Sequence, residues 1–152
     1  MRNAKVSCSG ERPGYSADFV INGIARTVGD NTNLWASDMS KSGAFICLRW
    51  DEEQSIKELR ITFDSDLSVK IMQSISDWII ERQSKEIPDT IVSNYRVEFY
   101  RKKSLVKQIN IVGNYQRLNV HHFDEIVCDS IRITIMKTNG SESTRIFELR
   151  AY

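Results

Sequence analysis

The sequence predicts a single all-β domain, a jelly-roll β-sandwich of about eight strands with one helical or irregular insertion. Apolar and polar residues alternate with a period of two, turn-rich segments separate the alternating runs, and the chain is 152 residues long. Because successive side chains of a strand point to opposite faces, such alternation is typical of strands with one buried and one solvated face. Several such runs in a chain of single-domain length indicate a sandwich or barrel.

The clearest alternating run carries Ile131, Ile133 and Ile135 at every second position, and residues 58–63 and 95–100 follow the same pattern. Arg101-Lys102-Lys103 predicts a charged hairpin tip, while Gly113-Asn114 and Asn139-Gly140 predict chain reversals. In chain order, the expected strands cover residues 4–8, 44–50, 56–63, 94–100, 104–111, 116–121, 130–136 and 144–152.

Two segments do not have the strand pattern. Residues 10–33 are rich in Gly, Asn, Asp and Ser, which predicts one long ordered loop. Residues 67–86 space Leu67, Ile71, Ile75 and Trp78 as a helix does, and Pro88 ends this segment. Long connections inside a compact domain are usually functional or inserted.

Composition excludes several classes of protein. Apolar residues make up 41% of the chain and the formal net charge is +1, which favours a folded domain and gives no electrostatic basis for nucleic-acid or membrane binding. Residues 1–5 lack the apolar core of a secretory signal, so either the protein is cytoplasmic or the chain is a segment of a longer one. Cys8, Cys47 and Cys128 are expected to be structural thiols, Cys47 buried in an apolar strand, with a Cys8–Cys128 disulfide as the alternative.

Several motifs follow one another in an order that resembles the discoidin-like, galactose-binding-like domain family. They are the Asn22-Gly23 turn, Leu34-Trp35-Ala36-Ser37, Phe45-Ile46-Cys47-Leu48, and the terminal Arg145-Ile146-Phe147-Glu148-Leu149. Residues 113–117 and His122-Phe123 are further similar to the C-terminal module of bacterial FAD-dependent oxidoreductases. The resemblance implies a jelly roll whose loops at one end bind a ligand, often a sugar, or pack against a catalytic domain.

The expected function is therefore that of a non-catalytic binding or docking module, with carbohydrate as a candidate ligand. We expect residues 1–152 to form one domain excised from a longer protein, an exported (periplasmic or extracellular) bacterial FAD-dependent oxidoreductase whose catalytic domain is its partner. A flavin fingerprint is missing, since only Gly23 and Gly29 come near the required spacing, so no cofactor other than calcium is expected here. The alternatives are a purely structural domain that stabilises a dimer or a catalytic partner, and a free-standing small hydrolase.

The ligand site is expected where residues 10–33 meet residues 67–86, with Trp78, Arg26, Asp38 and His122 as binding residues. An aromatic ring with a guanidinium and a carboxylate is typical of sugar recognition. Trp78 is alternatively part of the apolar face of a helix. Trp35 is either a sugar platform or, as the resemblance favours, a core residue that fixes the long loop.

The resemblance also implies calcium ligands at Asn22 and Glu148, although Asn22 replaces the family's usual aspartate. Otherwise Asn22 is a turn residue and Glu148 pairs with Arg145 or Arg150. His121 and His122 are expected on opposite faces of a strand and therefore not to share a metal ion. A Cys128–His121 nucleophile pair lacks a third orienting group, so no catalytic residue is assigned.

Overall fold

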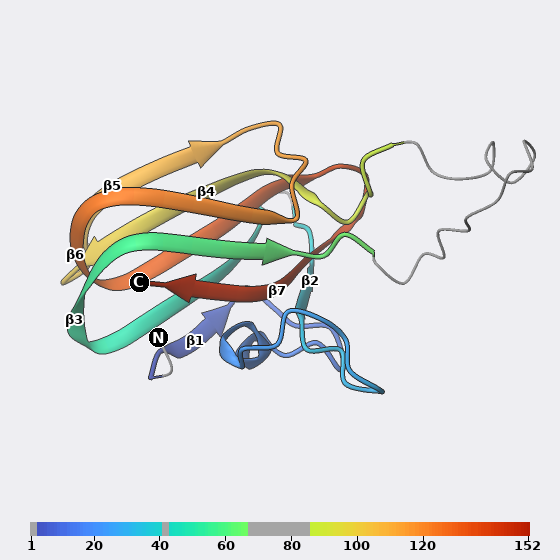
Figure 1. The fold of residues 1–152 in the computed structure, drawn as a ribbon, viewed down its shortest axis with the longest axis horizontal. Coiled ribbons are helices and arrows are strands. Elements are labelled where there is room, and N and C mark those ends of the chain that lie inside the picture. The colour runs from blue at the N-terminus through green and yellow to red at the C-terminus, as the bar shows by residue number, and fades with distance from the viewer. Residues whose placement is uncertain (1–2, 41–42, 67–85) are drawn as a thin grey trace, which may run out of the picture.

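The computed structural model describes residues 3–40, 43–66 and 86–152, and these residues form seven β-strands and one short 3-10 helix (Figure 1). All strand pairs are antiparallel. In chain order, the elements are β1 (Lys5–Cys8), η1 (Ala17–Ile21), β2 (Trp35–Asp38), β3 (Ala44–Phe63), β4 (Val92–Arg101), β5 (Ser104–Ile111), β6 (Leu118–Thr138) and β7 (Ser143–Ala151).

Two long strands, β3 and β6, build the sandwich. They pair with each other on both sides of a register shift between Arg49 and Gln54, and Figure 1 shows both turning at the same end of the molecule. The first half of β3 and the second half of β6 form one layer with β1, β4 and β5. The other halves form the second layer with β7 and β2. The expected sandwich is confirmed, but two pairs of expected strands are merged. The expected strands 44–50 and 56–63 form the single bent strand β3, and the expected strands 116–121 and 130–136 form the single bent strand β6.

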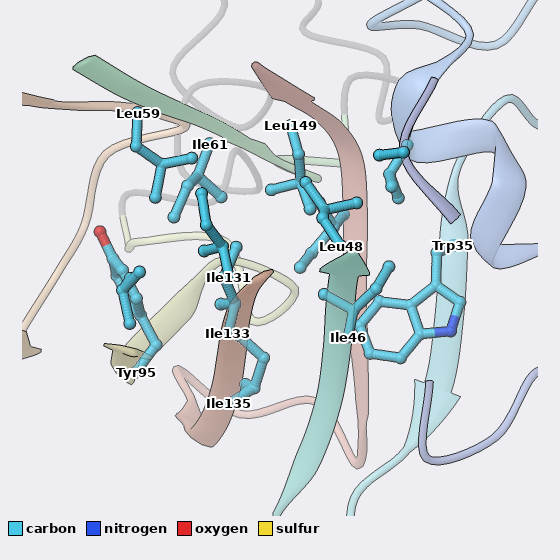
Figure 2. Packing of buried hydrophobic residues seen from close by; sticks show 14 of the residues in the cluster. Trp35, Ile46, Leu48, Leu59, Ile61, Tyr95, Ile131, Ile133, Ile135 and Leu149 are labelled. Carbon is cyan, nitrogen blue, oxygen red and sulfur yellow. The ribbon is translucent and has the colours of Figure 1, made fainter. Parts of the chain in front are cut away.

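Alternate residues of the two layers meet in the core (Figure 2). Ring centroids of Phe63 and Tyr95 lie 5.2 Å apart in an edge-to-face arrangement that links β3 to β4 across the sandwich. The largest fully buried side chains are Trp35, Tyr95, Phe63, Phe99, Ile46, Leu48, Leu59, Ile61, Ile131, Ile133, Ile135 and Ile146. Each of these side chains contributes about 1.5–3 kcal/mol through burial.

Trp35 is a core residue, as the resemblance favoured. Its ring has no exposed surface, and Nε1 donates a hydrogen bond of 2.9 Å to the carbonyl oxygen of Gly10. The prediction that Cys47 is buried is wrong. Its side chain is half-buried on the outer face, because Ile46 and Leu48 take the inward positions of β3. Cys8, Cys47 and Cys128 are all free, so the alternative Cys8–Cys128 disulfide is not formed.

The two ends of the sandwich differ. At the end where β3 and β6 turn, Arg101 forms a two-point ion pair with Glu53, at 2.9 and 2.6 Å, and Lys102 and Lys103 make the expected hairpin tip with positive φ. At the opposite end, which we call the loop end, lie the 10–33 loop, residues 64–66 after β3, and the connections that follow β5 and β6 (Figure 1). The 10–33 loop is ordered as expected, but it also contains η1, whose Ala17 and Val20 reach the core.

The helix expected over residues 67–86 lies almost entirely in residues 67–85, which are outside the described residues. Across the described part of the chain, no helix is long and apolar enough to cross a membrane.

Candidate functional site

A pocket of about 510 Å³ opens at the loop end, between the 10–33 loop and the start of β7. Residues distant in sequence meet here: the loop, the segment that follows β3, and β7 itself. The lining residues are Tyr15, Arg26, Thr27, Thr32, Leu34, Asp64, Asp66, Arg145 and Phe147. The volume falls within the range that small-molecule sites in proteins occupy.

The apolar part of the pocket is a small cluster separate from the main core. Leu34, Ala36 and Phe147 are buried together, and Tyr15 and Ala25 pack against them. Phe147 follows Ile146, which is buried in the main core, so β7 is covered on both faces at this point. The 10–33 loop supplies the cover on the outer face, and the pocket forms at its margin.

Two asparagines hold the base of the 10–33 loop. Asn22 caps η1, accepts a 2.7 Å hydrogen bond from the backbone N–H of Ile24, and donates one of 3.1 Å to the Asn33 side chain. Asn33, buried and in the left-handed conformation, donates a 3.2 Å hydrogen bond to the carbonyl oxygen of Arg26. This chain of hydrogen bonds fixes the backbone from which the Arg26 side chain extends.

One wall of the pocket carries an ion pair. The Asp64 carboxylate is buried and lies 3.2 Å from Nη1 of Arg145, and its other oxygen accepts a 2.9 Å hydrogen bond from the backbone N–H of Asp66. Thr90 donates a further hydrogen bond, 3.1 Å long, to the Asp64 carbonyl oxygen. Because a buried carboxylate needs such partners, this wall has a defined geometry.

The threonine hydroxyls of the pocket are oriented by the loop. Thr32 donates a 2.7 Å hydrogen bond to the carbonyl oxygen of Gly14, and Thr27 donates one of 3.3 Å to the carbonyl oxygen of Thr32. With their hydrogens used, both oxygens can only accept from a ligand. The pocket thus offers guanidinium donors, hydroxyl and carboxylate acceptors, and aromatic surface.

The three predicted binding residues that the structure describes do not line one pocket. Arg26 lines the pocket and is exposed. Asp38, at the end of β2, bonds to Arg12 at 2.6 Å, and His122, on the outer face of β6, lies 3.3 Å from Glu58; neither lines the pocket. Trp78 lies outside the described residues.

The two calcium candidates bond to different partners. Asn22 uses its side chain within the loop, as a turn residue does, while Glu148 on β7 lies 2.7 Å from Nη2 of Arg150. Within the residues that the structure describes, no group of three or more histidine, cysteine, aspartate or glutamate side chains could hold a metal ion.

His121 and His122 point to opposite faces of β6, as expected. Nε2 of His121 lies 2.8 Å from the Tyr95 hydroxyl, and burial followed by the nearby His122 lowers the pKa of His121. Cys128 is seven positions further along β6, about 20 Å at strand spacing, so it cannot pair with His121. Burial, with a smaller effect of Asp129, raises the pKa of the Cys128 thiol to about 11, the opposite of nucleophile activation.

Most of the pocket was not predicted from the sequence. One signal was present: Ile146 and Phe147 are adjacent apolar residues in a strand, which indicates that both faces are covered. Asp64 and Asp66 directly follow an expected strand and so had to lie at its end. Tyr15 and Thr32 gave no signal, because their contribution depends on how the loop folds back.

Neither a protein-family model nor a curated protein matches this chain. Solved structures share its fold. The lectin domain of lectinolysin, complexed with Lewis B antigen, aligns with a TM-score of 0.74 and 12% identity over 99% of this chain and 93% of that one. A fucose-binding module from Streptococcus pneumoniae aligns with a TM-score of 0.73 and 11% identity over 98% and 93%.

The family 32 carbohydrate-binding module of C. perfringens NanJ, in complex with galactose, aligns with a TM-score of 0.66 and 16% identity over 98% of this chain and 93% of that one. These similarities confirm the jelly-roll β-sandwich fold. None of the three is described as part of a FAD-dependent oxidoreductase, and that context stays a prediction.

Proposed function

We propose that this chain is a non-catalytic carbohydrate-binding module and that the loop-end pocket is its glycan site. The observation that carries the proposal is the composition of the pocket: apolar and aromatic surface from Tyr15, Leu34 and Phe147, bordered by Arg26, Asp64, Asp66, Arg145 and two threonines. A sugar ring has an apolar C–H face and a rim of hydroxyls that both donate and accept. Aromatic surface and directed polar groups complement these two parts.

The shared fold supports this proposal. The solved structures with this fold include proteins described as binding Lewis B antigen, fucose and galactose, and they present the same sandwich over nearly the whole chain. Because one fold can serve several functions, the proposal depends on the pocket and not on the fold alone.

A glycan screen of the whole chain tests the proposal. We expect binding to at least one glycan, and Tyr15→Ala should weaken it about tenfold, since removing a stacking ring typically costs about 1–2 kcal/mol. Tyr152→Ala is the matched control, because Tyr152 is an exposed tyrosine at the opposite end. Circular dichroism should show both variants folded.

The proposal fails if no glycan binds. It also fails if Tyr15→Ala and Tyr152→Ala reduce the affinity equally, because the pocket would then not be the site.

A further inference from the structure

The arginines at the pocket outnumber its aspartates once one neighbouring side chain is included. Its lining contains two arginines, Arg26 and Arg145, and two aspartates, Asp64 and Asp66. A third arginine, Arg117, lies directly behind it, with its guanidinium carbon 5.1 Å from the centre of the Phe147 ring. Three guanidinium groups and two carboxylates leave one positive charge.

The ion pairs show where this charge is. Arg145 and Asp64 neutralise each other at 3.2 Å. The guanidinium of Arg117 donates to two uncharged groups, the carbonyl oxygen of Ala25 and the Ser65 hydroxyl, and so keeps its charge. No described residue forms an ion pair with Arg26, whose backbone is nevertheless held by Asn33.

We propose that the glycan carries an anionic group, a uronic acid carboxylate or a sulfate ester, that Arg26 binds. This inference rests on the proposed function and names the class of its ligand. A guanidinium can donate two parallel hydrogen bonds to an oxyanion, which adds direction to the charge attraction. The group then lies at the wall formed by the 10–33 loop, while the sugar ring contacts the apolar cluster with Phe147.

The two carboxylates of the pocket limit where the anion can sit. Asp64 and Asp66 also line the pocket, and carboxylates accept hydrogen bonds from sugar hydroxyls but repel a second anion. We therefore expect one charged group per bound sugar unit, held by Arg26 and kept away from the two aspartates.

The test compares glycans that differ only in charge. Isothermal titration calorimetry with the whole chain measures binding of three charged oligosaccharides: oligogalacturonate, oligomannuronate and a sulfated galactan. It also measures binding of their uncharged counterparts, in which the carboxyl groups are reduced to alcohols or the sulfate esters are removed. We expect one of the charged glycans to bind at least about tenfold more tightly than its uncharged counterpart, and this preference to decrease at high salt.

Two variants assign the preference to Arg26. Arg26→Gln should reduce the tenfold ratio between the affinities of the charged and the uncharged glycan to about one, while Arg26→Lys should keep part of that ratio. Arg12→Gln is the matched control: Arg12 belongs to the same loop, pairs with Asp38 and does not line the pocket.

Each outcome bears on one of the two proposals. Tight binding of uncharged glycans without any preference for the charged ones would overturn this inference and leave the proposed function intact. The same holds if Arg26→Gln keeps the preference. If no glycan binds, charged or uncharged, the proposed function itself fails, and this inference with it.

Discussion

Arg117 joins the three parts of the chain that form the pocket. Its backbone carbonyl accepts a 2.8 Å hydrogen bond from Phe63 at the end of β3, and its guanidinium reaches Ala25 in the 10–33 loop and Ser65 after β3. The same guanidinium lies over the ring of Phe147 on β7. The other hydrogen bonds of the loop to the second layer run to β2, for example from the Arg12 N–H to the Ala36 carbonyl oxygen. Arg117 instead ties the loop to Ser65 and Phe147, so this side chain should affect how firmly the pocket walls are held.

We predict that Arg117→Ala loosens the 10–33 loop. Loss of the hydrogen bonds and of the cation–π contact should cost about 1–3 kcal/mol of unfolding free energy. Amides of the loop should exchange faster with deuterium, and glycan affinity should decrease through a faster dissociation rate. Arg117→Lys keeps the positive charge but lacks the planar guanidinium. It should therefore restore the attraction between this charge and the Phe147 ring, but not the protection of the loop amides from deuterium exchange.

Unchanged deuterium exchange in Arg117→Ala would show that the other contacts of the loop hold it without Arg117. The sequence did not identify Arg117 as a tie, because its partners lie 92 and 52 positions away along the chain. Period-two alternation predicts only which face of a strand a residue occupies, and the expected strand 116–121 included Arg117, which precedes β6 in the structure.

At the scale of elements, the turn between β2 and β3 contains a glycine that no other residue can replace. Gly43 has a φ of 84°, and a Cβ atom at this position would lie 2.2 Å from the backbone oxygen of Ile135. Ala44 pairs directly with Ile135 in the ladder of β3 and β6. A side chain at Gly43 would therefore push apart the two strands that build both layers.

We predict that Gly43→Ala destabilises the fold by about 3 kcal/mol or more, because it combines backbone strain with a clash against main-chain atoms. Gly113→Ala is the matched control: its φ is 71°, and nothing lies within 4 Å of the added carbon, so about 1 kcal/mol of strain is expected. Urea unfolding measures both. Equal losses of stability in the two variants would refute the close approach at Ile135.

The strands were predictable where burial alternates and were missed or divided elsewhere. β5 was predicted with its observed bounds, while the polar stretch Asp51-Glu52-Glu53 predicted a break that is really the bend of β3. β2 was not expected as a strand, because Trp35, Ala36 and Ser37 are all buried and show no alternation. Alternation alone does not reveal a short strand that is covered on both faces.

For the whole molecule, the sequence predicted the class of fold because the core of a sandwich depends on local alternation. The pocket depends on long-range geometry: Tyr15, Asp64 and Arg145 meet although they belong to three separated segments. Because of this difference, Arg26 is the predicted binding residue that also lines the pocket. The sequence predicted the loop end as the location of the candidate site, but it did not predict the other residues that line the pocket with Arg26.

Buried titratable groups should limit the pH range in which the whole fold is stable. Burial lowers the pKa of His121 below its ordinary 6.5, so the unfolded chain binds the proton more tightly and stability should fall as the pH drops below about 6.5. Burial raises the pKa of Cys128 from 9.0 to about 11, so the unfolded thiol ionises first and stability should fall as the pH rises through this interval.

Urea unfolding midpoints measured from roughly pH 4 to pH 11, the range in which both groups titrate, test this pH dependence. We expect a plateau between about pH 6.5 and 9 and a decline on both sides, with Cys128 contributing up to about 3 kcal/mol at the alkaline end. Cys128→Ala should reduce the alkaline decline, and His121→Gln, which can still bond to the Tyr95 hydroxyl, should reduce the early acid decline. An alkaline decline of unchanged size in Cys128→Ala would show that the thiol is not the group responsible.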